Sequence, residues 1–328
     1  MPYNHSLYFM KFFLKKLLPL IDAILILPTI FCALGLKLVR RLGVQRLPFT
    51  KRVLRNIGIF PLTKHYYEPQ FDNASPRIPY SRDRELSGIN WNVAGQLAQI
   101  EKLKFHEELK SLNTEKPDDY GFYVDNDAFK SGDAEYWYQI IRALKPKKII
   151  EIGSGYSTLL AIKAIEKNRS EDHKHQCKLT CIEPYEMPWL EKEAVEVIRQ
   201  PVEHLETSFF SSLGANDILF IDSSHIIRPQ GDVLYEYLEL LPTLSPGVVV
   251  HIHDIFSPRN YLESWLVDDI KFWNEQYLLE AFLTNNDSWE IIGSLNFLHH
   301  HHYDSLKSIA PFLKPSHEPG SFYIRKIK

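Results

Sequence analysis

Acidic and imidazole side chains follow two apolar segments in the second half of the chain. Asp222 comes directly after one segment, and His225 follows it three residues later. His253 and Asp254 stand at the end of the next apolar segment. If the two segments are neighbouring parallel strands, these side chains meet at one carboxyl edge, where open α/β sheets bind ligands. Two carboxylates and two imidazoles at such an edge suit a divalent cation, a general base, or both.

A glycine-containing turn lies upstream, between a predicted strand and a predicted helix. It reads Glu151-Ile-Gly153-Ser154-Gly155, with Thr158 three residues further on. Its glycines allow a tight turn and a close approach of a ligand, and the helix behind it offers free N–H groups. The dinucleotide fingerprint would need a glycine in place of Thr158, and no P-loop lysine follows. We therefore expect a cofactor site of another kind, and Glu151 suits a cofactor that carries an ammonium group.

The next predicted strand ends in a carboxylate, Glu183. It lies 28 residues after Gly155, at the tip of the strand expected beside the first one. A carboxylate at this place can accept hydrogen bonds from both hydroxyls of a ribose. The sequence thus predicts a nucleoside-containing cofactor between the glycine turn and Glu183.

Strands and helices alternate from Asp133 onward, which predicts an α/β fold with a parallel sheet covered on both faces. We expect a Rossmann-like, seven-stranded, mostly parallel sheet with an antiparallel edge hairpin. The predicted strands are Lys148–Ile152, Lys178–Glu183, Val195–Arg199, Ile218–Ile221, Val248–His253, Trp289–Phe297 and Ser321–Ile327. The predicted helices are Asp133–Leu144, Ser157–Lys167, Met187–Glu193, Gln230–Leu241 and Tyr261–Phe282. The histidine run 299–302 is expected to be a solvated loop.

Charge is distributed unevenly along the 328 residues. Residues 1–60 hold ten Lys/Arg and one acid, so they carry +9, whereas the remainder carries −12. A basic head on an acidic body favours a membrane or polyanion contact at the N-terminus and argues against nucleic acid as a partner of the body. We expect three parts: residues 1–60 as a membrane-associating segment, 61–124 as a connector and cap, and 125–328 as the catalytic domain. The three cysteines favour a reducing compartment.

The apolar segment Leu17–Leu36 has the length of a bilayer-spanning helix, plus basic flanks on both sides. Asp22, Pro19 and Pro28 are unfavourable within a span. A helix buried against the body or an oligomer partner, and a signal peptide, are the alternatives; the basic stretch that follows disfavours the signal peptide. Three basic residues precede the segment and seven follow it, so the positive-inside rule places the body in the cytoplasm.

Taken together, these motifs resemble those of the class I S-adenosylmethionine-dependent methyltransferases. They are Glu-x-Gly-x-Gly, an acid that ends the next strand, Ile-Asp-Ser-Ser-His, and His-Asp. The chain is most similar to the branch of macrocin-type and other small-molecule or sugar O-methyltransferases. The resemblance covers residue 125 to the C-terminus, including the closing strand 320–325.

The resemblance implies roles for individual residues. The cofactor-binding set would be Glu151, Gly153, Ser154, Gly155, Glu183 and Asp222. Metal-dependent members hold a divalent ion such as Mg²⁺ at the positions of Asp222 and Asp254. They usually add a third carboxylate or amide, for which His253 or Ile255 stands here, and this departure favours catalysis by histidine.

We therefore expect a membrane-associated methyltransferase that faces the cytoplasm and acts on a hydroxyl of a sugar, a lipid-linked saccharide or another small molecule. His225 or His253 would act as the base beside Asp222. An oligomer is compatible with this interpretation. The alternatives are an NAD-type oxidoreductase on a Rossmann-like fold and a catalytically silent, membrane-associated binding scaffold.

Overall fold

A computed structural model describes residues 4–65, 67–70, 76–117 and 121–328, with side chains from residue 16 onward. The chain divides into two compact units, Met1–Pro76 and Arg77–Lys328. The second unit contains every strand in the described part of the chain and both candidate site motifs.

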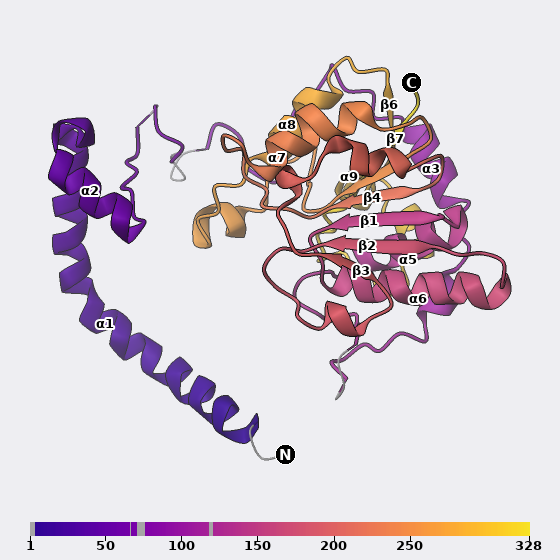
Figure 1. The fold of residues 1–328 in the computed structure, drawn as a ribbon, viewed down its shortest axis with the longest axis horizontal. Coiled ribbons are helices and arrows are strands. Elements are labelled where there is room, and N and C mark those ends of the chain that lie inside the picture. The colour runs from indigo at the N-terminus through magenta and orange to yellow at the C-terminus, as the bar shows by residue number, and fades with distance from the viewer. Residues whose placement is uncertain (1–3, 66, 71–75, 118–120) are drawn as a thin grey trace. The chain divides into compact units, whose positions relative to one another are not determined.

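A seven-stranded sheet forms the centre of the second unit, in the order β3-β2-β1-β4-β5-β7-β6 (Figure 1). The strands are β1 (Lys148–Ile152), β2 (Lys178–Ile182), β3 (Glu196–Ile198), β4 (Ile218–Ile221), β5 (Val249–Ile252), β6 (Trp289–Ser294) and β7 (Phe322–Lys326). The first five are parallel, and β7 runs antiparallel to both β5 and β6. The predicted mostly parallel sheet with an antiparallel edge is confirmed.

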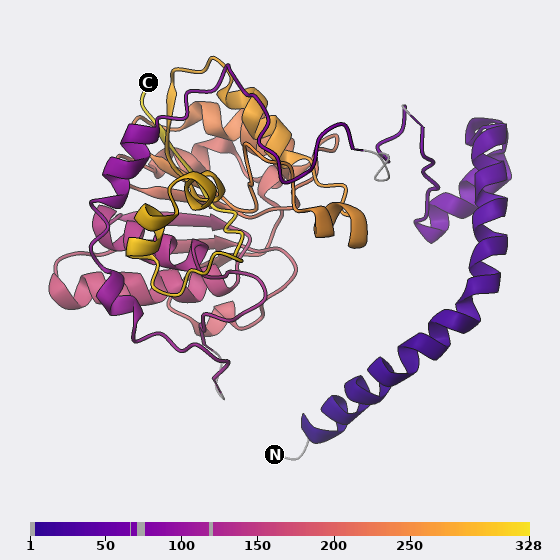
Figure 2. The same ribbon diagram turned by 180° about the vertical axis from the view of Figure 1, so that it is seen from behind.

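Helices cover both faces of this sheet (Figure 2). They are α3 (Val93–Ile100), α4 (His106–Leu109), α5 (Asp133–Leu144), α6 (Tyr156–Glu171), α7 (Asp232–Leu234), α8 (Glu275–Leu283), α9 (Leu295–His301) and α10 (Tyr303–Ile309). Alternate strand residues point to opposite faces, so Ile149 and Phe220 pack with α5 and α6, whereas Ile150 and Leu219 pack with the segment after α7 and with α8. Both faces are buried, which explains the nearly continuous apolar strands.

Several predicted elements differ from the structure; the helix expected over Met187–Glu193, for example, is only the short helical turn Leu190–Lys192. The long helix expected over Tyr261–Phe282 is wrong: a short helical turn, Ser264–Asp268, and a loop precede α8. Asn274 stops the helix from extending backward, because its backbone is not helical and its side chain accepts a hydrogen bond from the N–H of Ile227 at 2.6 Å. The aromatic periodicity of this stretch comes from rings such as Trp265 and Trp273 that pack on each other in the loop.

The edge hairpin is also different from the expectation. β6 and β7 do pair antiparallel, but α9 and α10 lie between them in sequence, and β7 enters the sheet between β5 and β6. The solvated loop expected for the histidine run 299–302 is wrong: His299–His301 form the end of α9, within this connection. His300 pairs with Glu318 at 2.8 Å and His301 with Asp83 at 2.6 Å, so these side chains have structural partners.

The first unit contains α1 (Asn4–Leu42), the short turn Val44–Arg46 and α2 (Pro48–Ile57). Pro19 and Pro28 lie inside α1 without ending it. Within the described residues, one helical stretch, Lys16–Leu42, is long and apolar enough to cross a membrane, with a mean hydropathy of 2.3 over its most apolar window and none of that window buried. A signal sequence near the N-terminus satisfies the same criteria of length and composition.

Candidate active site

The turn after β1 is shaped by Gly153. Its φ of +78° is a conformation that side chains other than glycine rarely adopt. A Cβ atom at this position would lie 2.0 Å from the backbone carbonyl oxygen of Asp222, at the end of β4. The missing side chain thus lets the turn and the end of β4 approach each other. Gly155, by contrast, has an extended backbone, and a Cβ there would meet nothing within 4 Å.

Glu151 lies beneath the turn and is fully buried. Its carboxylate accepts hydrogen bonds from the hydroxyl of Ser157 at 2.6 Å and from the hydroxyl of Thr158, both in the first turn of α6. Burial raises the pKa of Glu151 to about 7, against the effect of these donors. The geometry makes Glu151 a positioning residue that fastens α6 to β1, and its direct contact with a cofactor stays a prediction.

Glu183 stands at the end of β2, beside the turn. One of its carboxylate oxygens accepts the N–H of Ser154 at 3.3 Å, and the other accepts the N–H groups of Tyr185 and Glu186 at 3.0 Å each. These bonds fix the carboxylate at the rim of a cavity of about 350 Å³. The oxygen that accepts the N–H of Ser154 has a second lone pair, so a hydroxyl donor can still bind there.

The cavity joins the turn, Glu183 and the carboxyl end of β4. Its volume falls in the range of small-ligand pockets, about 300–1,000 Å³. Apolar side chains from the segment after β3 line one part of it, and polar side chains from the β4 loop line another. The lining residues include Ile152, Gly153, Glu183, Pro201, Val202, Asp222, Ser224 and Asp232. A glycine cradle, a fixed carboxylate and an apolar wall fit a nucleoside-containing cofactor.

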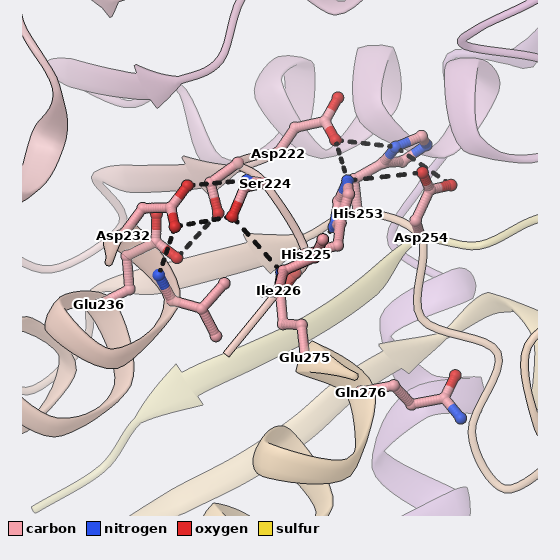
Figure 3. A network of polar contacts seen from close by, with 12 residues as sticks. Asp222, Ser224, His225, Ile226, Asp232, Glu236, His253, Asp254, Glu275 and Gln276 are labelled. Carbon is pink, nitrogen blue, oxygen red and sulfur yellow. Dashed lines mark hydrogen bonds and ion pairs between the residues drawn. The ribbon is translucent and has the colours of Figure 1, made fainter. Parts of the chain in front are cut away.

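The four side chains singled out at the strand ends lie together beside this cavity (Figure 3). His225 Nε2 is 3.2 Å from Asp222 Oδ1 and 3.7 Å from Asp254 Oδ2. His253 Nδ1 is 3.6 Å from Asp222 Oδ1 and 3.5 Å from Asp254 Oδ1. β4 and β5 are adjacent and in parallel register, which brings the four together. The imidazoles are buried, whereas 35% of the Asp222 side chain and 17% of the Asp254 side chain are exposed.

A second row of side chains holds His225. Its Nδ1 lies 2.8 Å from Oε2 of Glu275, a fully buried carboxylate at the start of α8. The hydroxyl of Tyr237 donates to the other oxygen of Glu275 at 3.0 Å. The ring of Trp273 packs on the imidazole with 4.2 Å between ring centroids. Glu275 therefore fixes the orientation of His225, so that Nε2 is the nitrogen that faces the two aspartates.

His253 is held more loosely. Its ring packs against Phe129, with 5.1 Å between ring centroids, and its Nε2 is 3.9 Å from a carboxylate oxygen of Asp133. Neither of its ring nitrogens has a partner within hydrogen-bonding distance. Asp133 is itself committed, because it accepts the backbone N–H of Gly320 at 3.1 Å and that of Ser321 at 2.7 Å.

Burial and neighbouring charges shift the pKa values of all four groups of this cluster. Burial would lower the pKa of His225, but its hydrogen bonds to Asp222 and Glu275 raise that pKa well above its ordinary value. Burial also opposes a charge on His253, whose pKa the carboxylates of Asp254 and Asp222 raise. Burial would raise the pKa of Asp222, yet the two imidazoles outweigh it and hold that pKa below its ordinary range. Burial instead raises the pKa of Asp254, against the effect of the two imidazoles.

Backbone strain accompanies the cluster. His225 has a φ of +60° and Asp254 a φ of +58°, conformations that are uncommon for residues other than glycine. Such conformations persist only where the surroundings hold them, and they concentrate at functional sites. Both residues lie in the loops that follow strand ends. Their backbone conformations direct the two side chains toward each other.

Sequence reasoning missed the residues that support the cluster. Glu275 was assigned to the middle of a long helix, and nothing in its neighbourhood in sequence links it to His225. Tyr237 and Trp273 were treated only as part of apolar helical patterns. Their partners lie 38 to 50 residues away in the chain, so only the packing of α8 against the β4 loop brings them into contact.

A family model described as a methyltransferase domain matches residues 150–255, which span β1 through β5 and contain the glycine turn and all four strand-end side chains. The chain belongs to the class I S-adenosylmethionine-dependent methyltransferases. Its cofactor is therefore S-adenosylmethionine, and this assignment replaces the oxidoreductase alternative.

The methyltransferase is similar to several known proteins. An uncharacterized protein of Archaeoglobus fulgidus is 30% identical over 179 residues, which cover 50% of this chain and 78% of the relative. Among solved structures, the plantazolicin methyltransferase BpumL in complex with SAH is similar with a TM-score of 0.34 at 16% identity, over 60% of this chain and 83% of that one. MycE methyltransferase, in complex with Mg and SAH, is similar with a TM-score of 0.31 at 15% identity, over 59% of this chain and 48% of that one.

Proposed function

We propose that this methyltransferase transfers a methyl group to a hydroxyl of a small molecule, and that the acceptor is a saccharide or a lipid-linked saccharide. The observation that carries the proposal is the meeting of Asp222, His225, His253 and Asp254 beside the cofactor cavity. A hydroxyl must lose its proton during methyl transfer, so an oxygen acceptor needs a base or a cation at the reacting atom. This cluster offers groups for both.

The cofactor supplies an activated methyl group on a sulfonium. Glu183 would hold the ribose hydroxyls, and Gly153 and Gly155 would let the backbone approach the rest of the cofactor. Glu151 would keep the turn in shape through α6. The chain's further contribution is alignment, because holding two reactants in line removes most of the entropic cost of their meeting.

A divalent cation is the first candidate for activating the hydroxyl. Asp222, His225 and Asp254 each offer one ligand atom, and these atoms lie within 4.8 Å of one another. The sequence argument against a cation was the missing third ligand beside Asp254; His225, which comes from the β4 loop, provides a third donor. Mg²⁺ prefers oxygen ligands, and its site here would hold two carboxylates and one imidazole. A cation bound there would lower the pKa of an acceptor hydroxyl.

A histidine base is the second candidate. The Glu275–His225 pair has the form in which a buried carboxylate fixes one imidazole nitrogen and leaves the other to handle a proton. His253 would serve in the same way, though it lacks a comparable orienting partner. Both candidates use the same acceptor position, at the carboxyl edge between β4 and β5.

Removal of divalent cations by a chelator distinguishes activation by a cation from catalysis by a histidine base. Methyl transfer from labelled S-adenosylmethionine to a panel of glycosides and lipid-linked sugars would be measured with and without chelator. If a cation is required, chelator abolishes turnover, Mg²⁺ restores it, and Asp254→Asn is nearly inactive. If histidine is the base, chelator has no effect, and loss of one imidazole lowers the rate by about 10²–10⁴.

Some outcomes would contradict the proposal itself. Full activity of a variant that lacks His225, His253 and the Asp254 carboxylate would remove the cluster from the reaction. Transfer to nitrogen or carbon acceptors alone would exclude O-methylation. Cofactor binding without transfer to any acceptor in a cell extract would favour the binding-scaffold alternative.

We also propose that α1 anchors the enzyme in a membrane, with the methyltransferase unit in the cytoplasm. Support comes from the apolar stretch Lys16–Leu42 and from the excess of basic residues after it. An anchor of this kind suits an acceptor that is itself held at a membrane. Extraction of the full-length protein from cell membranes by alkaline carbonate would contradict a span, and its secretion in a shortened form would show a signal sequence.

A further inference from the structure

Helix α2 has two faces of opposite chemistry. Phe49, Val53 and Ile57 recur every four residues, so they lie on one side of the helix. They are 80%, 55% and 63% exposed, so this apolar face has no cover within the described part of the chain. The apolar strip continues in the residues that follow the helix: Ile59, Phe60 and Leu62 are also exposed.

The opposite face of α2 is basic. Lys51, Arg52 and Arg55 are all exposed, and α2 contains no acidic residue. An exposed apolar stripe opposite a row of Lys and Arg is typical of helices that lie in the plane of a membrane surface. Soluble proteins instead bury such a stripe against their own core.

The same unit contains a basic groove, which is lined by the end of α1 and by residues that flank α2 in sequence. Its lining includes five basic side chains: Lys37, Arg40, Arg41, Arg46 and Lys64. Among the described residues of this lining, Glu68 is the one carboxylate, and it pairs with Arg40. So many like charges around one hollow repel each other in water, and an anionic surface would relieve that repulsion.

We propose that α2 and this basic groove form an interfacial element that binds the anionic lipid surface of the membrane. The inference builds on the proposed anchoring by α1, because the end of that helix lines the basic groove and would stand at the headgroup level. Phe49, Val53 and Ile57 would enter the boundary between headgroups and acyl chains. The basic side chains would meet the phosphates of anionic lipids, which attract polybasic segments next to a membrane helix.

The test separates α2 from α1 by using two full-length proteins. Alkaline extraction of cell membranes that contain the parent chain shows whether α1 anchors that chain. A second chain carries Gln in place of the exposed residues Ile24, Leu27, Ile30 and Phe31, which removes the apolar character of α1 without changing its charge. Sedimentation of this second chain with phosphatidylcholine vesicles, with and without phosphatidylglycerol, measures binding by α2 and the groove.

We expect the second chain to bind vesicles that contain phosphatidylglycerol and to lose that binding as salt is raised. Adding Lys51→Gln, Arg52→Gln and Arg55→Gln should weaken binding by about 10²-fold, because each basic residue at an anionic surface contributes about fivefold. Replacing Phe49, Val53 and Ile57 by Ser should also weaken binding, to both kinds of vesicle.

A matched control removes three charges elsewhere. Lys102, Lys104 and Lys174 are exposed in the second unit, so their replacement by Gln makes the same change in net charge and should leave binding unchanged. Equal binding to both kinds of vesicle, or equal loss in the control, would overturn the inference. Binding of S-adenosylhomocysteine by every variant shows that the second unit is folded. A parent that extracts from membranes while the second chain still binds anionic vesicles would contradict the anchor and leave this inference standing.

Discussion

Glu151 illustrates how burial changes the part that a carboxylate plays. As a residue two positions before a glycine turn, it suggests a direct ligand for a charged cofactor. In the fold it lies under the turn, with two hydroxyls of α6 as its partners. The same carboxylate thus shapes the site through α6, and its direct contact with the cofactor stays a prediction.

A pH-dependent cost of folding follows from this burial. The pKa of Glu151 is raised to about 7, so the folded protein holds a proton that the unfolded chain releases at lower pH. The contribution of Glu151 to the free energy of unfolding is complete below pH 4.3, about the pKa of a glutamate in the unfolded chain. It is lost as the pH rises toward 7. The Glu151→Gln variant lacks this titration. Relative to the parent, it should gain about 2–3 kcal/mol in unfolding free energy between pH 5 and 7.5, at about 1.4 kcal/mol per pKa unit.

Urea unfolding of both proteins at the two pH values measures this difference. Other groups titrate equally in the parent and the variant, so their effects cancel in the comparison. A constant difference between the two proteins across this range would show that Glu151 is ionised in the fold at low pH.

Glu183 carries the prediction for the cofactor. Glu183→Gln keeps the size of the side chain but removes its charge, so binding of S-adenosylhomocysteine should weaken by about 1.5–3 kcal/mol, the scale of hydrogen bonds to a charged group. Calorimetric titration measures the change. Glu186→Gln, three residues away on an exposed position, is the control and should bind as the parent does. Equal affinity in both variants would place the ribose elsewhere.

At the scale of elements, the turn between β1 and α6 offers a matched pair of glycines. Gly153→Ala places a Cβ against the carbonyl of Asp222 and demands an unfavourable φ, so it should lower both stability and cofactor affinity. Gly155→Ala has open space and an extended backbone, so it should fold as stably as the parent, while its methyl group adds bulk to the turn that the cofactor is expected to approach.

Thermal unfolding and titration with S-adenosylhomocysteine test the pair together. We expect Gly155→Ala to lose affinity at least tenfold with an unchanged melting temperature, whereas Gly153→Ala loses both. Normal affinity in Gly155→Ala would mean that the cofactor does not approach this part of the turn.

The helices and strands also show which parts of the fold can be predicted from the sequence. Strands β1, β2, β4 and β5 were predicted because apolar runs bounded by polar residues are typical of buried parallel strands, and their adjacency placed Asp222 beside Asp254. The order β5-β7-β6 was not predicted in full, because the helices between β6 and β7 have a weak apolar pattern. Glu275 was missed because the contact that gives it a role joins two segments far apart in the chain. Periodicity reports local structure, while such contacts depend on tertiary packing.

At the scale of the whole molecule, the two compact units predict that anchoring and cofactor binding are separable. The turn, the cavity and the strand-end cluster all lie within Arg77–Lys328. Removing residues 1–76 should therefore release the protein from membranes and leave its affinity for S-adenosylhomocysteine within about twofold, because no site residue is removed. Fractionation and calorimetry on the shortened and full-length proteins measure both. A large loss of affinity would show that the first unit contributes to the site.

The position of β7 has a consequence for how the enzyme is made. A ribosome synthesises β5 and β6 before it reaches Phe322–Lys326. Until then β5 and β6 have no strand between them, and each presents an unpaired edge that can join another chain. The sheet thus cannot close until the end of the chain has been made. Translation that stops short of residue 322 would leave β5 with an open edge and β6 without its neighbouring strand, and such unpaired edges favour aggregation.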